Sequence, residues 1–252
     1  MKKFELTSET KINIFGKKLF RIKALISFAD VEAGETGGWV EKEGNVNQSG
    51  NAWVYGDAMV FGDAMVFGDA KVSGDAMVYD DAKVSGDAMV SGNAWVYGDA
   101  KVYDDAKVSG DAMVSGNAWV YGDAKVSGNA WVYGDAKVYG DAKVYDDAWV
   151  YGDAKVYGDA KVYDDAKVSG DAWVYGDAKV SGDADYTTIH GFGTQFRTTT
   201  FFRCKDKKVR VACGCFFGTI PEFREQVKNT RKGKIAEEYL MIADLMEKHF
   251  EK

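Results

Sequence analysis

Apolar and polar residues recur along the centre of the chain with a period of six. From Gly50 to Ser181 the unit G-[D/N]-A-x-V-[Y/S/F] continues without insertion or deletion, which makes 132 residues or 22 hexads. In an extended segment Ala and Val point to one side and x to the other. The G-[D/N] pair suits a corner, because Gly accepts positive φ and Asp or Asn tolerates left-handed backbone. Each hexad therefore predicts one short strand and one corner.

A strand this short cannot bury its apolar side alone, so successive strands must coil and stack as a β-solenoid. The spacing of Val and small residues is similar to the hexapeptide-repeat family, whose fold is a left-handed parallel β-helix with three hexads per triangular turn. The resemblance covers all 22 units and implies about seven coils. The expected fold is mainly β: a β-hairpin cap over residues 1–49, a left-handed parallel β-helix over 50–187 and a small α+β domain over 188–252.

If three hexads close one turn, residues 18 apart share a face and the outward side chains sort into three columns. The second column is rich in Lys and Ser, as a solvated face would be, and the third mixes Lys, Met, Trp and Tyr. The first column and its flanking aromatics form an apolar stripe, which we predict as a binding face: Met59, Met77, Trp95, Met113, Trp131, Trp149, Tyr97, Tyr133 and Tyr151.

This apolar stripe is larger than the patch that a soluble monomer normally exposes. We expect one of three things to cover it: a second and third copy of the chain, the C-terminal helices folding back, or a foreign protein partner. Trp, Tyr and Met are residue types that dominate interface hot spots. Hexapeptide proteins commonly trimerise through their prisms, so the resemblance favours a homo-oligomer, either a trimer or a dimer.

The two flanks supply candidate caps for the open ends of the solenoid. Residues 11–25 predict a hairpin that turns at Gly16, and residues 25–56 resemble the N-terminal cap of YdcK-type hexapeptide proteins, a family labelled acetyltransferases by its repeat. The tail predicts strands at 198–204 and 209–216. A helix then begins after Thr219, with Glu222 at the capping-box position, and a second helix covers about 235–250.

Composition limits the classes of function. The chain has 46% apolar residues and a single proline, which indicates a folded protein, and no run approaches the 18 apolar residues that a membrane helix needs. With no signal-peptide pattern and three cysteines in one region, we expect a cytoplasmic protein with reduced thiols. The repeat holds 22 Asp against 11 Lys, a balance of −11, which argues against nucleic acid as a partner.

Candidate catalytic chemistry is sparse. The hexapeptide acyltransferases that the repeat resembles use a histidine between neighbouring prisms as a general base. Here the two histidines, His190 and His249, lie outside the repeat, and no loop interrupts the hexads. The tail contains His190 close in sequence to Arg197, so His190 is the candidate base if the chain is an acyltransferase.

Two further candidate sites in the tail, one for zinc and one for an anion, also have simpler structural explanations. Cys204, Cys213 and Cys215 could bind zinc with a histidine, but the C-x-C spacing favours buried thiols, so we expect no metal and no cofactor. A phosphate or nucleotide could bind at the helix start, and the residues for it are Arg197, Arg203, Gly218 and Thr219. Ordinary helix capping is the plainer explanation for this pattern.

The sequence as a whole predicts a non-catalytic β-solenoid scaffold or binding module that self-associates through its apolar face. The strings CGCF, GT and EF after residue 212 resemble the tails of hexapeptide-repeat proteins from bacteria and their phages. That resemblance suggests a phage-type role in binding a host protein or a small signalling ligand. The alternative is a YdcK-like acyltransferase with His190 as its base.

Overall fold

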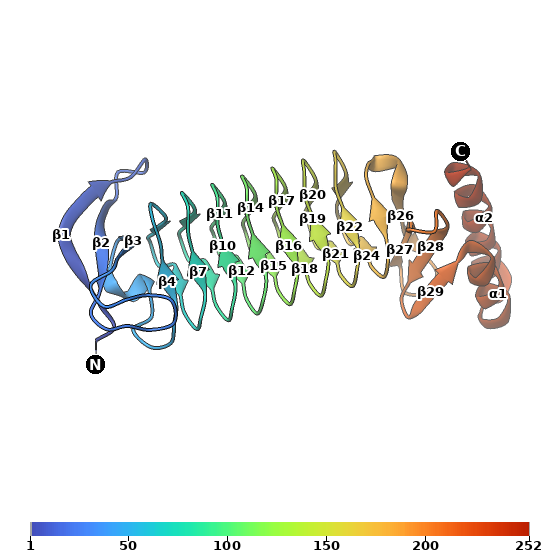
Figure 1. Ribbon diagram of the computed structural model, residues 1–252. Helices are drawn as coiled ribbons and strands as arrows, with labels where there is room; N and C mark the ends of the chain where they lie inside the picture. Colours follow the sequence, from blue (N-terminus) through green and yellow to red (C-terminus); the bar gives the residue numbers. More distant parts are fainter. Residues whose placement is uncertain (1, 252) are drawn as a thin grey trace.

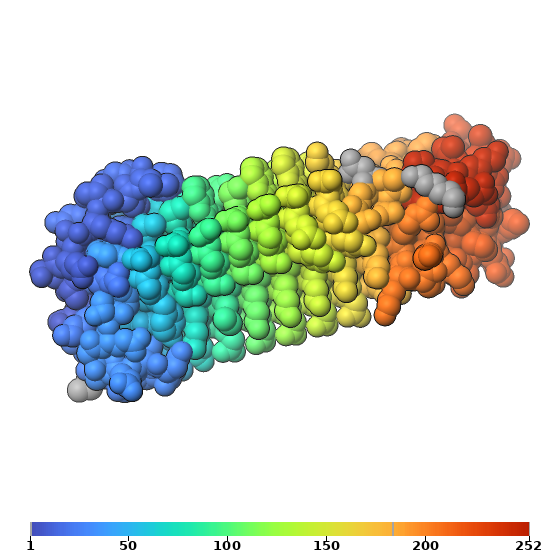
Figure 2. Space-filling model, turned by 45° about the horizontal axis from the view of Figure 1, so that its top comes forward, coloured from blue at the N-terminus to red at the C-terminus, as the bar shows by residue number. Residues whose placement is uncertain are grey.

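The computed structural model describes residues 2–251 and is a rod with the two chain termini near opposite ends (Figure 1). Most of the rod is a parallel β-solenoid with three sheets, and the hexads supply one two-residue strand each. In the space-filling view the coils follow one another as parallel rows between a cap at each end (Figure 2).

Three parallel sheets form the sides of the solenoid, and their strands have the following bounds. Sheet 1 contains β5 (Met59–Val60), β8 (Met77–Val78), β11 (Trp95–Val96), β14 (Met113–Val114), β17 (Trp131–Val132), β20 (Trp149–Val150) and β23 (Lys167–Val168). Sheet 2 contains β4 (Trp53–Val54), β7 (Lys71–Val72), β10 (Met89–Val90), β13 (Lys107–Val108), β16 (Lys125–Val126), β19 (Lys143–Val144), β22 (Lys161–Val162) and β25 (Lys179–Val180). Sheet 3 contains β6 (Met65–Val66), β9 (Lys83–Val84), β12 (Lys101–Val102), β15 (Trp119–Val120), β18 (Lys137–Val138), β21 (Lys155–Val156) and β24 (Trp173–Val174).

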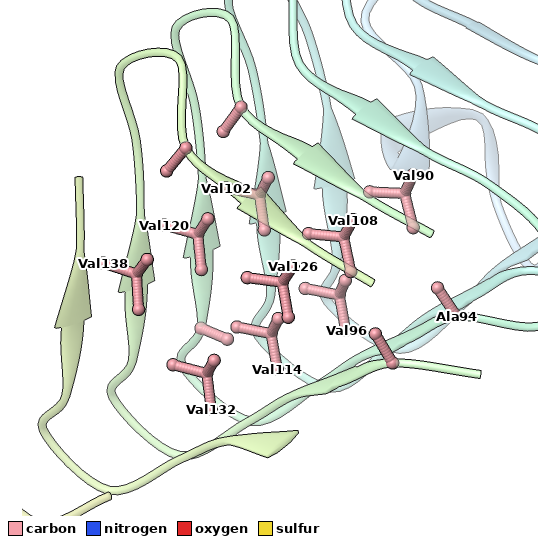
Figure 3. Packing of buried hydrophobic residues seen from close by; sticks show 14 of the residues in the cluster. Val90, Ala94, Val96, Val102, Val108, Val114, Val120, Val126, Val132 and Val138 are labelled. Atoms are coloured by element: carbon pink, nitrogen blue, oxygen red, sulfur yellow. The ribbon is translucent and has the colours of Figure 1, made fainter. Parts of the chain in front are cut away.

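The register confirms that three hexads make one turn. Trp95 pairs with Met113, and Val96 pairs with Val114, so residues 18 apart stack on the same side. The inward Ala and Val side chains of all 22 hexads are fully buried and form one continuous core along the rod (Figure 3). Burial of this kind is the main stabilising contribution that such short strands can make. The three columns of outward residues are therefore those expected from the sequence.

The corners explain the second half of the hexad. Nearly all repeat glycines have φ near +70°, and the backbone of the next coil lies so close that a Cβ at Gly74 would come within 2.8 Å of the carbonyl oxygen of Gly92. Four hexads have Asp instead of Gly at this corner, and these residues also take positive φ, at Asp80, Asp104, Asp146 and Asp164. A non-glycine residue in this conformation costs free energy.

The N-terminal cap is a hairpin that leads directly into the solenoid. β1 (Phe4–Ile12) and β2 (Lys18–Ala24) are antiparallel, and β2 pairs with β3 (Thr36–Val40). Strand β3 then pairs in parallel with β5, and after the 3-10 turn Glu43–Asn45 a bridge joins Val46 to Val66. The first turn thus begins ahead of Gly50, and the solenoid has about eight turns.

The C-terminal domain is a four-stranded antiparallel sheet followed by two helices. Its strands are β26 (Tyr186–Phe192), β27 (Arg197–Arg203), β28 (Val209–Cys213) and β29 (Phe216–Thr219), and its helices are α1 (Ile220–Thr230) and α2 (Gly233–Phe250). A 3-10 turn, Asp183–Asp185, precedes the sheet. Thr219 caps α1 in a capping box with Glu222, as expected. The sequence predicted two strands here, and the structure has four, because β26 and β29 extend the sheet on either side.

This sheet closes the end of the solenoid with one face and carries the helices on the other. Phe202, Cys204 and Ala212 join the solenoid core, and the backbone of Lys205 donates to the carbonyl oxygen of Asp177. The opposite face packs against α1 and α2 through a second core that includes Phe201 and Phe223. The helices therefore lie beyond the end of the rod and do not fold back along its sides (Figure 1).

Candidate functional site

The apolar stripe on sheet 1 is partly covered, and the N-terminal hairpin covers it. Leu19 of β2 is fully buried in a cluster with the first rungs, and the ring of Phe15 lies 5.2 Å from that of Tyr79. Met77 is only 5% exposed. Because the hairpin makes these contacts and the C-terminal helices pack on their own sheet, the alternative in which the helices fold back onto the stripe is wrong.

Beyond the hairpin the stripe is open. Met113, Trp131 and Trp149 follow one another on β14, β17 and β20, and the Trp131 side chain is 37% exposed. The two indole rings stack with centroids 5.0 Å apart, and Tyr133 stacks on Tyr151 beside them at the same spacing. Aromatic pairs of this kind contribute stability beyond the area that they bury.

Sheet 3 forms the floor of a long groove of about 1440 Å³. Its floor carries the outward residues from Met65 to Trp173, and a column of Asp and Asn residues from Asp63 to Asp171 lines one edge. Lys101 and Lys137 each place Nζ over the ring of Trp119, at 4.6 and 4.7 Å from its centroid. The groove therefore combines aromatic rings with fixed rows of positive and negative charge.

A ladder of tyrosines runs beside the floor of this groove. Tyr103, Tyr121, Tyr139, Tyr157 and Tyr175 stack on one another with centroids 4.7–4.9 Å apart. Burial within the ladder, together with the neighbouring phenol, raises the pKa of Tyr139 and of Tyr157 to about 12. These phenols stay protonated at neutral pH and offer a rigid, uncharged row of hydroxyl groups.

The groove ends against the C-terminal domain. Its end is lined by Trp173 of the last rung together with His190, Phe196 and Arg197 of the β26–β27 hairpin, and by Gly214 and Cys215 of the turn before β29. The backbone of Trp173 donates to Oγ1 of Thr200, which ties the last rung to β27. The domain thus stands across the end of the groove as a wall.

His190, the candidate base, lies in this wall. Its Nδ1 is 3.2 Å from Oγ1 of Thr198, and the side chain is exposed. Among the residues described, no carboxylate is hydrogen-bonded to the ring, so nothing of that kind orients it as in a catalytic triad. His249 lies on α2, remote in the chain, with its ring against Phe250.

The four residues of the candidate anion site do not converge. Arg197 and Arg203 are at opposite ends of β27. Arg203 is paired with Asp185 at 3.3 Å and donates to the carbonyl oxygen of Phe250. At the start of α1 the carboxylate of Glu222 accepts from the backbone and hydroxyl of Thr219, which holds the pKa of that carboxyl below its usual value. The Glu222 carboxylate thus occupies the place of an external anion beside Thr219 and Gly218.

The three cysteines lie in different surroundings. Cys204 is buried in the core between solenoid and sheet, and burial raises the pKa of its thiol to about 12. Cys213 packs toward the helices and accepts a hydrogen bond from Thr199, while Cys215 is exposed in the groove wall. Within residues 2–251 no group of three or more His, Cys, Asp or Glu side chains is placed to hold a metal ion.

A second groove, of about 820 Å³, follows sheet 2. Its floor is a lysine ladder on five consecutive rungs, Lys107, Lys125, Lys143, Lys161 and Lys179. A column of Asp residues from Asp87 to Asp177 lines it, and Lys205 closes its end. Rows of opposite charge side by side are typical of a solvated surface, as expected for this column.

The groove on sheet 3 could not be assigned from the columns alone. Trp173 belongs to the repeat, whereas Phe196 and Arg197 follow it in the non-repetitive tail, and only the position of the β26–β27 hairpin brings the two segments to one groove. The one available signal was that Trp173 is the last aromatic residue of its column.

Comparison with known proteins adds to this description of the solenoid. Residues 82–98 and 106–122 match the family model of the YdcK beta solenoid repeat. These two segments carry YdcK-like β-solenoid repeats. No curated protein compared with the chain matches it. Within the described residues, no helix is both long and apolar enough to cross a membrane.

Proposed function

We propose that the protein is a non-catalytic β-solenoid scaffold and binding module that self-associates, as a dimer or trimer, through the open part of the stripe on sheet 1. The observation that supports this proposal is the row formed by Met113, Trp131 and Trp149, which lies beyond the cluster that the hairpin covers; Trp131 is exposed and the other two are half-buried. Large aromatic residues on a flat surface are the usual anchors of protein interfaces.

The hairpin tip enlarges the same apolar surface. Ile12, Ile14 and Phe15 are all exposed, and the Phe15 ring lies 6.4 Å from the ring of Trp95 on the neighbouring rung. Phe15, whose ring lies against those of Phe61, Tyr79 and Trp95, joins the tip to the stripe. Removal of such a surface from water by a second copy would supply the free energy of association.

An acyltransferase role is less well supported. The hexads contain no protruding loop from Gly50 to Ser181, and His190 is hydrogen-bonded to Thr198 and, among the described residues, to no carboxylate. We expect no turnover of acetyl-CoA by the purified protein with amine or hydroxyl acceptors. Turnover that is abolished by His190→Ala would overturn the non-catalytic assignment.

Self-association is tested with the double variant Trp131→Lys, Trp149→Lys, measured by light scattering over a hundredfold range of protein concentration. Lysines on successive rungs are compatible with the fold, because sheet 2 carries five of them. The wild type should be an oligomer and the double variant a monomer, since the two added charges would lie in the interface.

The matched control is Trp119→Lys on sheet 3, which changes the same residue type on another side of the rod. This variant should associate like the wild type. A wild-type protein that stays monomeric at every concentration, or a double variant that associates like the wild type, would contradict the proposal.

A further inference from the structure

The last rung of sheet 3 differs from the rungs before it. Trp119, the other ring of this column, has a neighbour on each side, Lys101 and Lys137. Trp173 has Lys155 on one side, with Nζ 4.5 Å from the ring centroid, but β24 is the edge strand of the sheet. Its indole is 38% exposed and lines the end of the groove. One face of the indole is therefore available for another group.

A second exposed ring lines the same end of the groove. Phe196 lies at the tip of the β26–β27 hairpin, is 65% exposed and has φ of +47°. A left-handed conformation is rare for an aromatic residue, and such strain is commonly retained where it serves a function. The end of the groove thus offers two aromatic side chains to an apolar group.

One arginine at this end has no described ion-pair partner and can bind an anion. Arg203 and Arg210, the other arginines of the sheet, are paired with Asp185 and Asp206. Arg197 forms no ion pair with a described carboxylate, and it lines the groove beside His190. Lys155 contributes a second positive charge on the floor, and Asp171 lies on the groove edge, where it can accept hydrogen bonds from a ligand amide.

The shape of the groove selects the kind of ligand. It runs the length of sheet 3 and stops at the wall, so a polymer lying in it must end there. At this end Asp153 and Asp171 balance the charges of Lys155 and Arg197, so the group that favours a carboxyl terminus is Arg197, which has no described carboxylate partner. Lys and Asp columns along the floor suit a peptide of mixed charge, whereas the Asp column would repel the phosphates of a nucleic acid.

We propose that the groove on sheet 3 binds an extended peptide whose carboxyl-terminal residue is aromatic, with its ring between Trp173 and Phe196 and its carboxylate on Arg197 and His190. Capture of a terminal carboxylate is an established mode of peptide recognition. The rungs repeat at roughly 4.8 Å and an extended peptide rises about 3.4 Å per residue, so an octapeptide spans about six rungs. This site is on a different side of the rod from the self-association surface and does not depend on it.

The test uses fluorescence anisotropy with the full-length protein and labelled octapeptides. The probes are GSKSGDSF as the free acid, the same peptide as its carboxyl-terminal amide, and GSKSGDSA as the free acid. We expect the first to bind wild type at least tenfold more tightly than either of the others. Trp173→Ala and Arg197→Gln should each weaken binding of the first peptide by at least tenfold, while circular dichroism shows an unchanged fold.

The matched control is Trp131→Ala, which removes an equally exposed tryptophan from sheet 1. It should leave peptide affinity unchanged even where it alters the oligomeric state, so failure of this proposal and failure of self-association give different results. Equal affinity for acid and amide, or no binding of any of the three peptides, would overturn the proposal. Binding of adenosine monophosphate that is lost in Trp173→Ala, without peptide binding, would assign the site to nucleotides instead.

Discussion

The two ends of the solenoid both carry a tryptophan on a terminal rung, and the caps treat these residues differently. Trp53, on the first rung of sheet 2, is fully buried, with the rings of Phe4 and Phe28 edge-on to it at 5.9 and 5.4 Å. Trp173, on the last rung of sheet 3, keeps one face in a groove. The N-terminal cap thus buries an outward residue, whereas the C-terminal cap closes the interior and leaves an outward residue available.

The difference arises from what each cap is made of. The hairpin β1–β2 and the segment after it wrap around the sides of the first turns, so they reach outward side chains on sheets 1 and 2. The C-terminal sheet crosses the end of the rod and contacts inward residues, the last backbone groups and the ring of Tyr175. The N-terminal cap therefore buries outward side chains of the first turns, and the C-terminal sheet forms the wall at the end of the groove on sheet 3.

The largest expected effect is on stability at the two tryptophans. Trp53→Ala should lower the free energy of unfolding by about 3–5 kcal/mol, because it empties a fully buried site, whereas Trp173→Ala should cost less than about 1 kcal/mol. Thermal unfolding followed by circular dichroism measures both. Equal losses for the two variants would show that the two tryptophans contribute equally to stability and that the caps do not treat them differently.

A smaller effect, on how stability depends on pH, is expected from Lys3, which is buried in the N-terminal cap. Its Nζ donates to the carbonyl oxygens of Ala52 and Gly50, and burial lowers its pKa to about 8. Between pH 8 and 10.5 the folded state has lost this proton while the unfolded state retains it, so the contribution of Lys3 makes the fold more stable as pH rises.

The measurement for Lys3 compares wild type with Lys3→Met in urea at pH 7.5 and pH 9.5. Because both proteins share every other titrating group, the difference between them isolates Lys3. The wild type should gain on the order of 2 kcal/mol relative to the variant over this interval. A gap that stays constant between the two pH values would mean that Lys3 titrates alike in both states.

The smallest expected effect is on stability at two corners, and it tests whether the rungs near the two ends differ. Asp80→Gly near the hairpin and Asp164→Gly near the C-terminal domain both remove a side chain from a left-handed corner, with φ of 59° and 52°. Each should stabilise the protein by roughly 0.5 kcal/mol, since the relief of strain is partly offset by the greater freedom of Gly in the unfolded chain. Similar increases in the free energy of unfolding would show that the two ends differ in their caps and not in their rungs. A loss of stability in either variant would contradict the strain explanation.

Repetition explains which features could be predicted from the sequence. A period of six sustained over 22 hexads identified the strands, the corners and the three outward columns, and the register confirms these columns. The capping box at Thr219 and Glu222 was equally clear, because it depends on four adjacent residues. Segments that occur once were less predictable: β26 and β29 were missed, and β3 adds a turn that lies outside the hexads.

The sequence by itself determined the solenoid, because local turn chemistry and the alternation of Ala and Val leave a short strand only one way to bury its inner side. It also determined which residue types share each side of the rod. Only the tertiary structure decided that the hairpin covers the first half of the apolar stripe and that Trp173, Phe196 and Arg197 meet at the end of a groove. Those contacts join residues without a common period, so their positions depend on how the two caps dock.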